Sequence, residues 1–332
     1  MATIPDEYRA RLPKSWRSWA ESLPELVDSY LELWELEIVG SLPMNAMYVV
    51  PVARSDGRQC VLKVQPTDVP GVEGARLEML GLRLAGPAAV EVLAEDAGAG
   101  VLLLERAVPG TTLVGLAGRD DDLATETLAG VIADYGRPVE DPEQSGLRAF
   151  SEYAEAFETF DRGRFGDIPR SKAAARPDTG LTVILGIDEL GTGMPALRRH
   201  RQTAERLLRE LEADSVEPYL LHGDLHHENV LLDEARGHLV IDAWGLYGER
   251  AADVAPAMHN PIDLVARTED LVGLFRRRLA IYSGVLGIDR DRLAAWCYAY
   301  DVIRTLWSTE GDEVLPEDHW GVRSVAALRT MI

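Results

Sequence analysis

The spacing of apolar residues changes near residue 107, and this change limits the folds that the chain can adopt. Before it, short apolar runs rich in β-branched residues alternate with turn residues, a pattern typical of antiparallel strands. After it, apolar residues recur mainly at the three- and four-residue spacing of amphipathic helices. The sequence therefore predicts a β-rich lobe, a connection at residues 107–110 and a mainly helical lobe.

The first lobe is predicted to form an antiparallel sheet that one helix interrupts. Residues 55–57, SDG, have the composition of a hairpin turn between two of its strands. Before the sheet, a helix is expected to begin at Ser22, because Ser22 and Glu25 fit a capping box around Pro24. The strands are expected at residues 36–40, 46–53, 59–65, 88–96 and 100–107, with the helix at residues 72–84.

Helical patterns dominate the second part of the chain, with one interruption. Two short apolar runs, at residues 230–232 and 238–241, flank a polar turn and predict a β-hairpin. The expected fold class is therefore α+β with two lobes, residues 1–107 holding an N-terminal helix and the sheet, and residues 108–332 holding most helices. The helices of the second lobe are predicted at residues 121–136, 151–160, 196–214 and 291–307.

An excess of acidic residues restricts the partners that the chain can bind. It has 34 Lys and Arg against 55 Asp and Glu, a formal net charge of −21, which would repel the phosphate backbone of a nucleic acid. The same charge would attract a polycationic ligand, although it also keeps a protein soluble. The sequence therefore predicts no nucleic-acid partner, and nothing in it indicates an obligate protein partner.

The sequence also indicates where the protein resides. No apolar run approaches the roughly 20 residues of a membrane helix, and the first residues lack the layout of a secretory signal. Cys60 and Cys297 are too few for a disulfide framework or a structural zinc site. A cytoplasmic location without membrane association is expected.

The densest group of functional side chains is the segment HGDLHHEN at residues 222–229. Asn229 follows Asp224 by five positions, and Asp242 follows Asn229 by thirteen, across the predicted hairpin. In phosphoryl transfer, an Asp accepts the proton of the substrate hydroxyl, while an Asn and a second Asp at such intervals hold Mg²⁺. Mg²⁺ prefers hard oxygen ligands and usually takes one or two carboxylates together with substrate phosphates. The spacing predicts Asp224 as the catalytic residue, with Asn229 and Asp242 as metal ligands.

Two other interpretations of this segment are weaker. A polar loop whose Asp and Asn cap turns explains any single residue, but less readily all three in order beside predicted strand ends. A dinuclear metal phosphoesterase needs more ligands, because His200, His259 and His319 lack metal-type spacing. The other polar residues of the segment are expected to be structural: His226, His227 and Glu228.

Lys63 is the second candidate for nucleotide chemistry. It lies in the predicted strand VLKV, where its side chain points away from its aliphatic neighbours and toward the space between the lobes. A kinase lysine in this place contacts the α- and β-phosphates and is oriented by an acid on the next helix. Glu78 is the first choice for that acid and Glu73 the second, while an exposed strand lysine is the plain alternative.

Five segments of the chain carry a resemblance to a known family. The sequence resembles the aminoglycoside phosphotransferase family of protein-kinase-like antibiotic kinases, and within it the streptomycin 6-phosphotransferase and hydroxyurea phosphotransferase group. The resemblance spans most of residues 16–262, and the pairing of HGDLHHEN with a downstream IDxxG is its most specific part. The segments are WELEIVG, YVVPVARSDGRQCVLKVQ, LLLERAVPGTTL, LHGDLHHENVLL and IDAWGLYGERAADVAP.

The resemblance implies a protein-kinase-like fold that binds ATP and Mg²⁺ between its lobes. It also implies transfer of the γ-phosphoryl group to a hydroxyl of a streptomycin-like aminoglycoside antibiotic, which gives resistance. The resemblance implies the same roles for the catalytic, metal-binding and phosphate-binding residues predicted above. It adds a hinge at residues 104–107, where Glu105 and Ala107 bind adenine through their backbone. His222 becomes a structural member of the catalytic loop, and Asp253 a brace for that loop.

The sequence departs from the family in two places. The turn at residues 40–45, expected to cover the phosphates, has a single glycine, and the group's Asp-Pro-Lys-Gly is DAWG at residues 242–245. Trp244 either stacks on the acceptor or packs in the core. Glu249 and Asp253 are possible contacts for a cationic acceptor, although bracing roles are more expected. Two alternatives stay open, a kinase of another small metabolite and a nucleotide-binding protein without catalysis.

Overall fold

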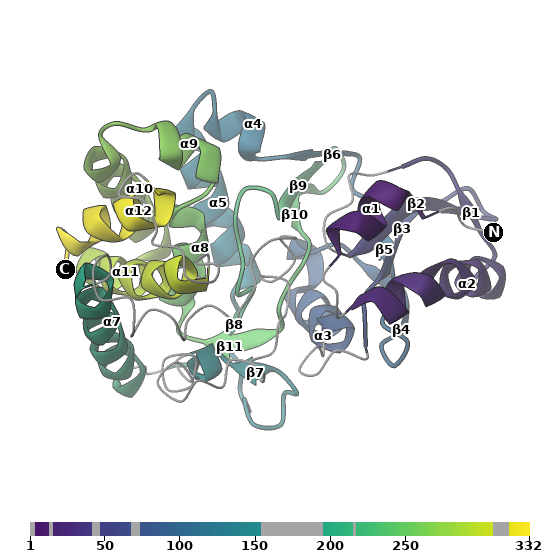
Figure 1. Cartoon of the computed structure of the whole chain (residues 1–332), viewed down its shortest axis with the longest axis horizontal. Coiled ribbons are helices and arrows are strands. Elements are labelled where there is room, and N and C mark those ends of the chain that lie inside the picture. Colours follow the sequence, from purple (N-terminus) through teal and green to yellow (C-terminus); the bar gives the residue numbers. More distant parts are fainter. Residues whose placement is uncertain are drawn as a thin grey trace.

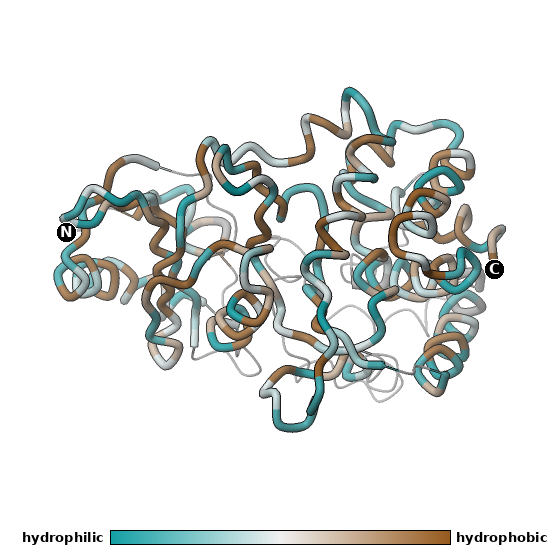
Figure 2. Tube along the Cα trace, turned by 180° about the vertical axis from the view of Figure 1, so that it is seen from behind, coloured by the Kyte–Doolittle hydropathy of each residue, from teal (hydrophilic) through white to brown (hydrophobic). Residues whose placement is uncertain are grey.

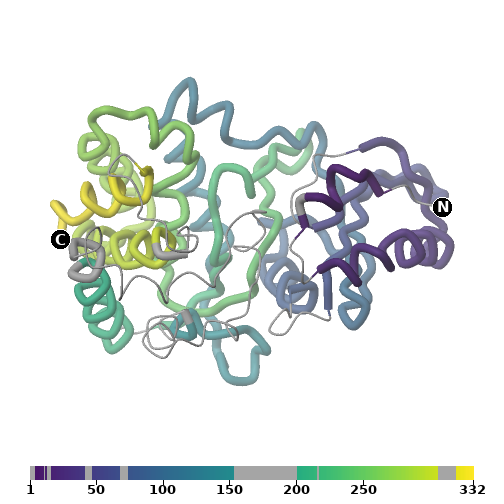
Figure 3. The backbone as a smooth tube through the Cα atoms, viewed as in Figure 1, coloured from purple at the N-terminus to yellow at the C-terminus, as the bar shows by residue number. Residues whose placement is uncertain are grey.

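The computed structural model describes residues 4–12, 16–41, 47–67, 74–153, 195–214, 217–307 and 319–332. A sheet with three helices forms one end of the molecule, and most other helices form the opposite end (Figure 1). The N- and C-terminal ends of the chain lie at these opposite ends (Figure 3). The order of the elements is that of the predicted α+β fold with a small β lobe and a larger helical lobe.

The small lobe is built on a five-stranded antiparallel sheet with the strand order β1-β2-β3-β5-β4. One face of the sheet packs against helix α2, so that residues of β2 and β3 share a core with apolar residues of the helix. The central strands are coloured mainly as hydrophobic, while α2 alternates between the two colours (Figure 2). The elements are α1 (Asp6–Arg11), α2 (Arg17–Leu33), β1 (Leu36–Ile38), β2 (Tyr48–Arg54), β3 (Gln59–Val64), α3 (Gly74–Ala85), β4 (Val92–Asp96) and β5 (Val101–Glu105).

Helix α2 begins earlier than its sequence predicts. It starts at Arg17, so Ser22 and Pro24 lie inside it, and the predicted capping box at Ser22 is wrong. The hydroxyl of Ser22 donates to the carbonyl of Trp19 at 3.0 Å, which satisfies this polar group within the helix. Trp19 and Leu23 are buried against the sheet, and this packing extends the helix by more than a turn.

The large lobe surrounds helix α11. Residues 293–303 of this helix are all buried, as expected of a helix with neighbours on every side. Within the described residues, no helix is long and apolar enough to span a membrane. The helices are α4 (Val114–Ala117), α5 (Asp121–Tyr135), α7 (Pro195–Ala213), α8 (Ala255–Met258), α9 (Ile262–Arg267), α10 (Leu271–Leu286), α11 (Arg290–Trp307) and α12 (Trp320–Arg329).

The predicted hairpin at residues 230–241 is present and belongs to a three-stranded sheet in the order β10-β9-β6. Strand β6 begins within the connection predicted at residues 107–110 and extends to Thr112, where the sequence predicts no strand. Because β6 is an edge strand and Pro109 is its first residue, the missing N–H of the proline costs no central ladder bond. The strands are β6 (Pro109–Thr112), β7 (Arg148–Ala149), β8 (Tyr219–Leu221), β9 (Val230–Asp233), β10 (Gly237–Val240) and β11 (Leu246–Gly248).

Helix α3 lies directly on the backbone that follows strand β10. A Cβ atom on Gly81 would lie 3.2 Å from the Cα of Gly245, and a Cβ on Gly245 would lie 2.3 Å from the carbonyl oxygen of Leu77. Gly245 also has φ +61°, a left-handed conformation that favours glycine. The chain therefore needs glycine at residue 245 to bring α3 and the large lobe into contact.

We expect Gly245→Ala to destabilise the protein more than Gly287→Ala. Both glycines are left-handed, with φ +61° and +67°, but a Cβ at residue 287 would meet nothing within 4 Å. The two variants share a conformational cost of roughly 1–2 kcal/mol, and the clash with α3 should add roughly 1–3 kcal/mol at residue 245. Urea unfolding measures both; equal losses of stability would contradict the backbone contact.

Candidate active site

The segment predicted to be catalytic forms the loop between β8 and β9. The carboxylate of Asp253, from the 3₁₀ helix Arg250–Val254, supports the start of this loop. Its Oδ2 accepts a hydrogen bond from the His222 N–H at 2.7 Å, and its Oδ1 accepts one from the Gly223 N–H at 2.8 Å. Asp253 therefore braces the loop, as expected, and its side chain is too deeply buried to meet a ligand.

The ring of His222 connects the loop to Ile241, the residue that follows strand β10. Its Nε2 lies 2.8 Å from the carbonyl oxygen of Ile241, and its Nδ1 accepts from the Asp224 N–H at 3.3 Å. Since a carbonyl only accepts, Nε2 carries the proton, and these bonds describe a neutral imidazole. Gly223, at φ +85°, has no room for a Cβ, which would lie 2.6 Å from Leu246. The backbone before Asp224 is thus fixed by buried contacts.

Asp224 and Asn229 are linked by a hydrogen bond within the loop. The side-chain N–H of Asn229 donates to the backbone carbonyl of Asp224 at 2.8 Å. The Asp224 side chain is 15% exposed, and its Oδ2 lies 3.7 Å from His226 Nε2. Burial would raise the pKa of Asp224, but the nearby His226 and Arg304 lower it, and the net pKa is well below its ordinary value. The carboxylate of Asp224 is therefore ionised at neutral pH.

Asp242 lies beside Asn229 across the hairpin. The N–H of Ile241 donates to the backbone carbonyl of Asn229 at 3.1 Å, which brings the next residue, Asp242, to the same end of the hairpin. Because the Asn229 amide nitrogen is engaged by Asp224, its oxygen points elsewhere, and with Asp242 it offers two hard oxygen donors. A dinuclear metal site requires a cluster of several His, Cys, Asp or Glu side chains. Among the described residues, no group of three or more such side chains could hold a metal ion.

Lys63 connects the sheet of the small lobe to Asp242. Its Nζ lies 2.7 Å from Glu78 Oε1 on α3 and also contacts Asp242 Oδ1. Burial would lower the pKa of Lys63, but the carboxylates of Asp242 and Glu78 raise it above its ordinary value. The structure thus brings together Lys63, Glu78 and Asp242; Glu73 lies outside the described residues.

Gln65 is a member of this cluster that the sequence reasoning missed. Its side-chain Nε2 donates to Glu78 Oε2 at 2.5 Å, so both oxygens of the buried carboxylate are bonded. The signal was present in the sequence, because Gln65 and Lys63 are two residues apart and project from the same face of an extended chain. Gln65 fixes the orientation of the Glu78 carboxylate.

The predicted hinge, residues 104–107, begins in the last two residues of strand β5 and continues beyond it. The Glu105 N–H donates to the carbonyl of Glu91 at 2.8 Å, and the Glu105 side chain is bound by the Glu91 N–H at 3.0 Å. Ala107 is buried, and no described residue accepts a hydrogen bond from its backbone N–H. Of the turn at residues 40–45, residues 42–45 lie outside the described part of the chain.

Trp244 and Glu249 have structural positions. Trp244 is 4% exposed within the main core, so of its two predicted roles the structure supports core packing and not stacking on an acceptor. Both carboxylate oxygens of Glu249 pair with Arg292, at 2.5 and 2.7 Å. Glu249 is therefore not a free contact for a cationic acceptor.

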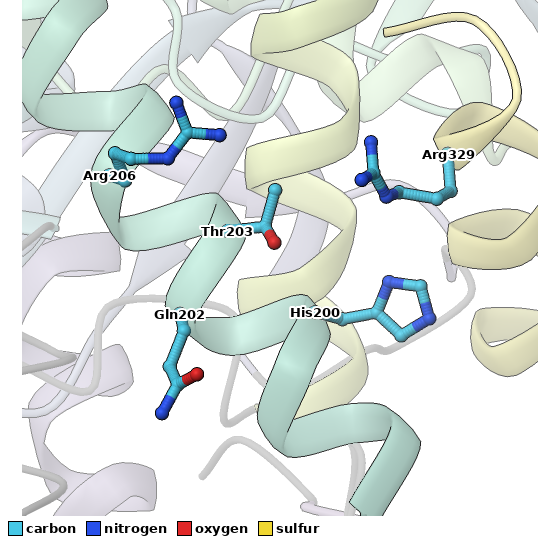
Figure 4. Close-up of a pocket in the computed structure, with 5 residues that line it drawn as sticks. All are labelled: His200, Gln202, Thr203, Arg206 and Arg329. Atoms are coloured by element: carbon cyan, nitrogen blue, oxygen red, sulfur yellow. The ribbon is translucent and has the colours of Figure 1, made fainter.

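One pocket of about 510 Å³ lies away from these residues, between α7 and the end of α12 (Figure 4). Arg206 and Arg329 approach it from opposite sides, with Thr203 between them (Figure 4). Its remaining lining residues are Gln202 and His200, whose Nδ1 lies 2.8 Å from the Tyr298 hydroxyl. No predicted site residue lines this pocket, so it is separate from the candidate active site.

Comparison with known proteins agrees with the resemblance predicted from the sequence. A family model described as aminoglycoside/hydroxyurea antibiotic resistance kinase matches residues 37–311. A streptomycin 6-kinase from Streptomyces glaucescens is 32% identical over 316 residues, which cover 93% of this chain and 92% of that protein. A hydroxyurea phosphotransferase from Kitasatospora aureofaciens is 33% identical over 313 residues, covering 93% and 80%.

Solved structures share the fold. The amicoumacin kinase hAmiN, in complex with AMP-PNP, Ca²⁺ and Ami, superposes with a TM-score of 0.54 at 15% identity, covering 98% of this chain and 95% of that chain. At this identity the likeness concerns the fold alone. The predicted two-lobed protein-kinase-like α+β fold is confirmed.

We expect Asp253→Asn to change how the stability of the protein depends on pH. Burial and the charge of Asp224, opposed by the two backbone N–H groups, raise the pKa of Asp253 from 3.8 to about 7. Folding therefore takes up a proton between about pH 4 and 7, so this group's contribution to the free energy of unfolding falls as pH rises through that window. The variant lacks the titrating group, and its stability should fall less steeply over that range.

Urea unfolding of both proteins between pH 5 and 8 measures this slope. Glu249→Gln is a suitable control, because it removes another carboxylate that pairs with Arg292 instead of bracing the loop. Parallel curves for the wild type and Asp253→Asn would show that Asp253 titrates normally in the folded protein.

Proposed function

The chain belongs to the family of aminoglycoside/hydroxyurea antibiotic resistance kinases, and we propose that it transfers the γ-phosphoryl group of Mg-ATP to a hydroxyl of a cationic, streptomycin-like antibiotic. The observation that carries the proposal is the contact of Lys63 with both Glu78 and Asp242, next to a loop that holds Asp224 and Asn229. Phosphoryl transfer needs these side-chain types in one place.

Lys63, Asn229 and Asp242 form the nucleotide end of the proposed site. Lys63 would bind the α- and β-phosphates, and Glu78 would orient it through the pair that the two already make. The oxygens of Asn229 and Asp242 would hold Mg²⁺, which neutralises negative charge on the transferring phosphoryl group when bound. A structural relative was solved with AMP-PNP and Ca²⁺, which supports a nucleotide and a divalent cation here.

The hinge would bind the adenine ring through its backbone. The carbonyl of Glu105 and the N–H of Ala107 are the groups proposed for this contact. Ala107 is suited to the role, since its N–H has no acceptor among the described residues. A ring nitrogen of adenine would supply an acceptor for this N–H group.

Asp224 would act on the acceptor. Its lowered pKa keeps it ionised at neutral pH, so that it can accept the proton of the acceptor hydroxyl as the oxygen attacks the γ-phosphorus. The bond from that phosphorus to the bridging oxygen of ADP breaks, and ADP leaves with the electron pair. His222 and Asp253 would hold the Asp224 backbone through this step without touching the substrate.

The proposed acceptor is cationic for two reasons. A streptomycin 6-kinase is 32% identical over most of the chain, and the net charge of −21 would concentrate a polycation near the protein. A second candidate is hydroxyurea, which is neutral, because a hydroxyurea phosphotransferase is equally similar, at 33% identity. The charge of the acceptor therefore distinguishes the two candidates.

We expect the purified protein to consume ATP with streptomycin and not with hydroxyurea. The KM for streptomycin should rise with salt, because screening acts over about 8 Å at physiological ionic strength, while kcat stays nearly level. A coupled ADP assay with both acceptors, at low and high salt, makes the measurement. Turnover of hydroxyurea alone, with a KM independent of salt, would transfer the proposal to the neutral acceptor.

Asp224→Asn is the control for this assay. Loss of a general base lowers the rate by roughly 10² to 10⁴, and nucleotide binding and melting temperature should remain close to those of the wild type. Turnover by the variant at the wild-type rate would remove Asp224 from the proposed chemistry, while absence of turnover in the wild type with every hydroxyl acceptor would remove the kinase proposal.

We expect Asp242→Asn to weaken nucleotide binding more in Mg²⁺ than in EDTA. The variant removes a charge that would hold the metal, and it also removes one of two carboxylates that contact Lys63. Calorimetry of AMP-PNP with Mg²⁺ and with EDTA separates these effects. Identical affinities of wild type and variant in Mg²⁺ would exclude Asp242 as a metal ligand.

A further inference from the structure

Arg236 joins three segments of the chain around the proposed hinge. It lies in the turn between β9 and β10, in the large lobe. Its Nη1 contacts Oε2 of Glu105, the last residue of β5, and its Nη2 donates to the carbonyls of Pro87 and Ala89 at 3.0 and 3.2 Å. One guanidinium therefore binds the hinge and, at the same time, the 3₁₀ helix Gly86–Ala88 and its C-cap, which follow α3.

Asp233, the last residue of β9, binds the chain directly after the hinge. Asp233 Oδ2 accepts from the Val108 N–H at 3.0 Å, and its Oδ1 accepts from the N–H groups of Ala235 and Arg236 at 3.0 and 2.9 Å. The carbonyl of Val108 accepts from the Glu234 N–H at 2.9 Å. The turn between β9 and β10 is thus ordered by its own hydrogen bonds. It binds residues 105 and 108, which lie on either side of Ala107 in the sequence.

The pair of Arg236 and Glu105 is partly shielded from water. The side chains are 31% and 16% exposed, and the same Glu105 oxygen also accepts from the Glu91 N–H at 3.0 Å. Charge-assisted bonds of this kind hold geometry better than a single pair on the open surface. The planar fork of arginine reaches all three acceptors, whereas one lysine ammonium cannot match that arrangement.

We infer that Arg236 is a positioning residue for the nucleotide. Arg236 binds both Glu105 and the 3₁₀ helix after α3. These bonds fix the position of the backbone at residues 105–107, which binds the purine in the proposed function. Arg236 touches neither the phosphates nor the acceptor and acts only through the hinge. The inference rests on the proposed binding of ATP at this hinge, and neither the sequence pattern nor the family resemblance assigns a role to Arg236.

The test is the affinity of Arg236→Ala for AMP-PNP, measured by calorimetry with Mg²⁺, together with steady-state kinetics. The dissociation constant and the KM for ATP should rise about five- to twentyfold, as loss of a few charge-assisted bonds implies. The kcat and the acceptor KM should stay within about twofold, because the interaction is uniform in ground and transition states. Arg236→Lys, which keeps the charge but not the fork, should fall between wild type and alanine.

Two further variants keep the test decisive. Arg206→Ala removes an exposed pair with Glu210, at 3.1 Å, far from the hinge and should leave every constant unchanged. Should Arg236→Ala fail to fold, Glu105→Gln removes the charge at the other end of the pair and should raise the same dissociation constant. Wild-type affinity in folded Arg236→Ala, or a matching loss of kcat and acceptor binding, overturns the inference. Absence of AMP-PNP binding by the wild type overturns the proposed function as well.

Discussion

The buried ammonium group of Lys63 connects three parts of the molecule, and the candidate site depends on it. Strand β3 supplies the lysine, α3 supplies Glu78, and the large lobe supplies Asp242. Glu78 is fully buried, and its pair with Lys63 at 2.7 Å offsets the cost of placing a carboxylate in the protein interior. The position of the sheet relative to the large lobe is therefore fixed by a charge balance and not only by apolar packing.

The supports of this cluster are made of backbone as much as of side chains. The backbone of helix α3 contacts the backbone at Gly245 with no side chain between them. This contact fixes the distance of α3, and so of Glu78, from the large lobe. Asp253 binds two consecutive N–H groups before Asp224, and the His222 ring binds the carbonyl of Ile241, which follows β10. Groups held in this way lose little freedom when a substrate arrives, which is what preorganisation means in physical terms.

Sequence reasoning identified the cluster because its members obey local rules. Lys63 points toward Glu78 and Asp242 because side chains alternate along a strand, and the hairpin that separates Asn229 from Asp242 has a clear apolar pattern. It failed where the outcome depends on distant neighbours. Trp244 has the same local pattern whether it stacks on a ligand or packs in a core, and the partners of Arg236 lie 131 to 149 residues away in the chain. Helix α2 starts earlier than predicted because the sheet buries Trp19. Strand β6 forms because it pairs with β9.

The hydrogen bond from Asn229 to the carbonyl of Asp224 explains why this position carries an amide. A carboxylate would attract a cation more strongly, but it has two acceptors and no donor, so it would be repelled by the carbonyl that now receives the amide N–H. An amide has one group for each function: its N–H donates to the Asp224 carbonyl and holds the loop, and its oxygen remains for a ligand. The residue at this position is thus chosen by the need for one donor and one acceptor, and the strength with which it attracts a cation is secondary.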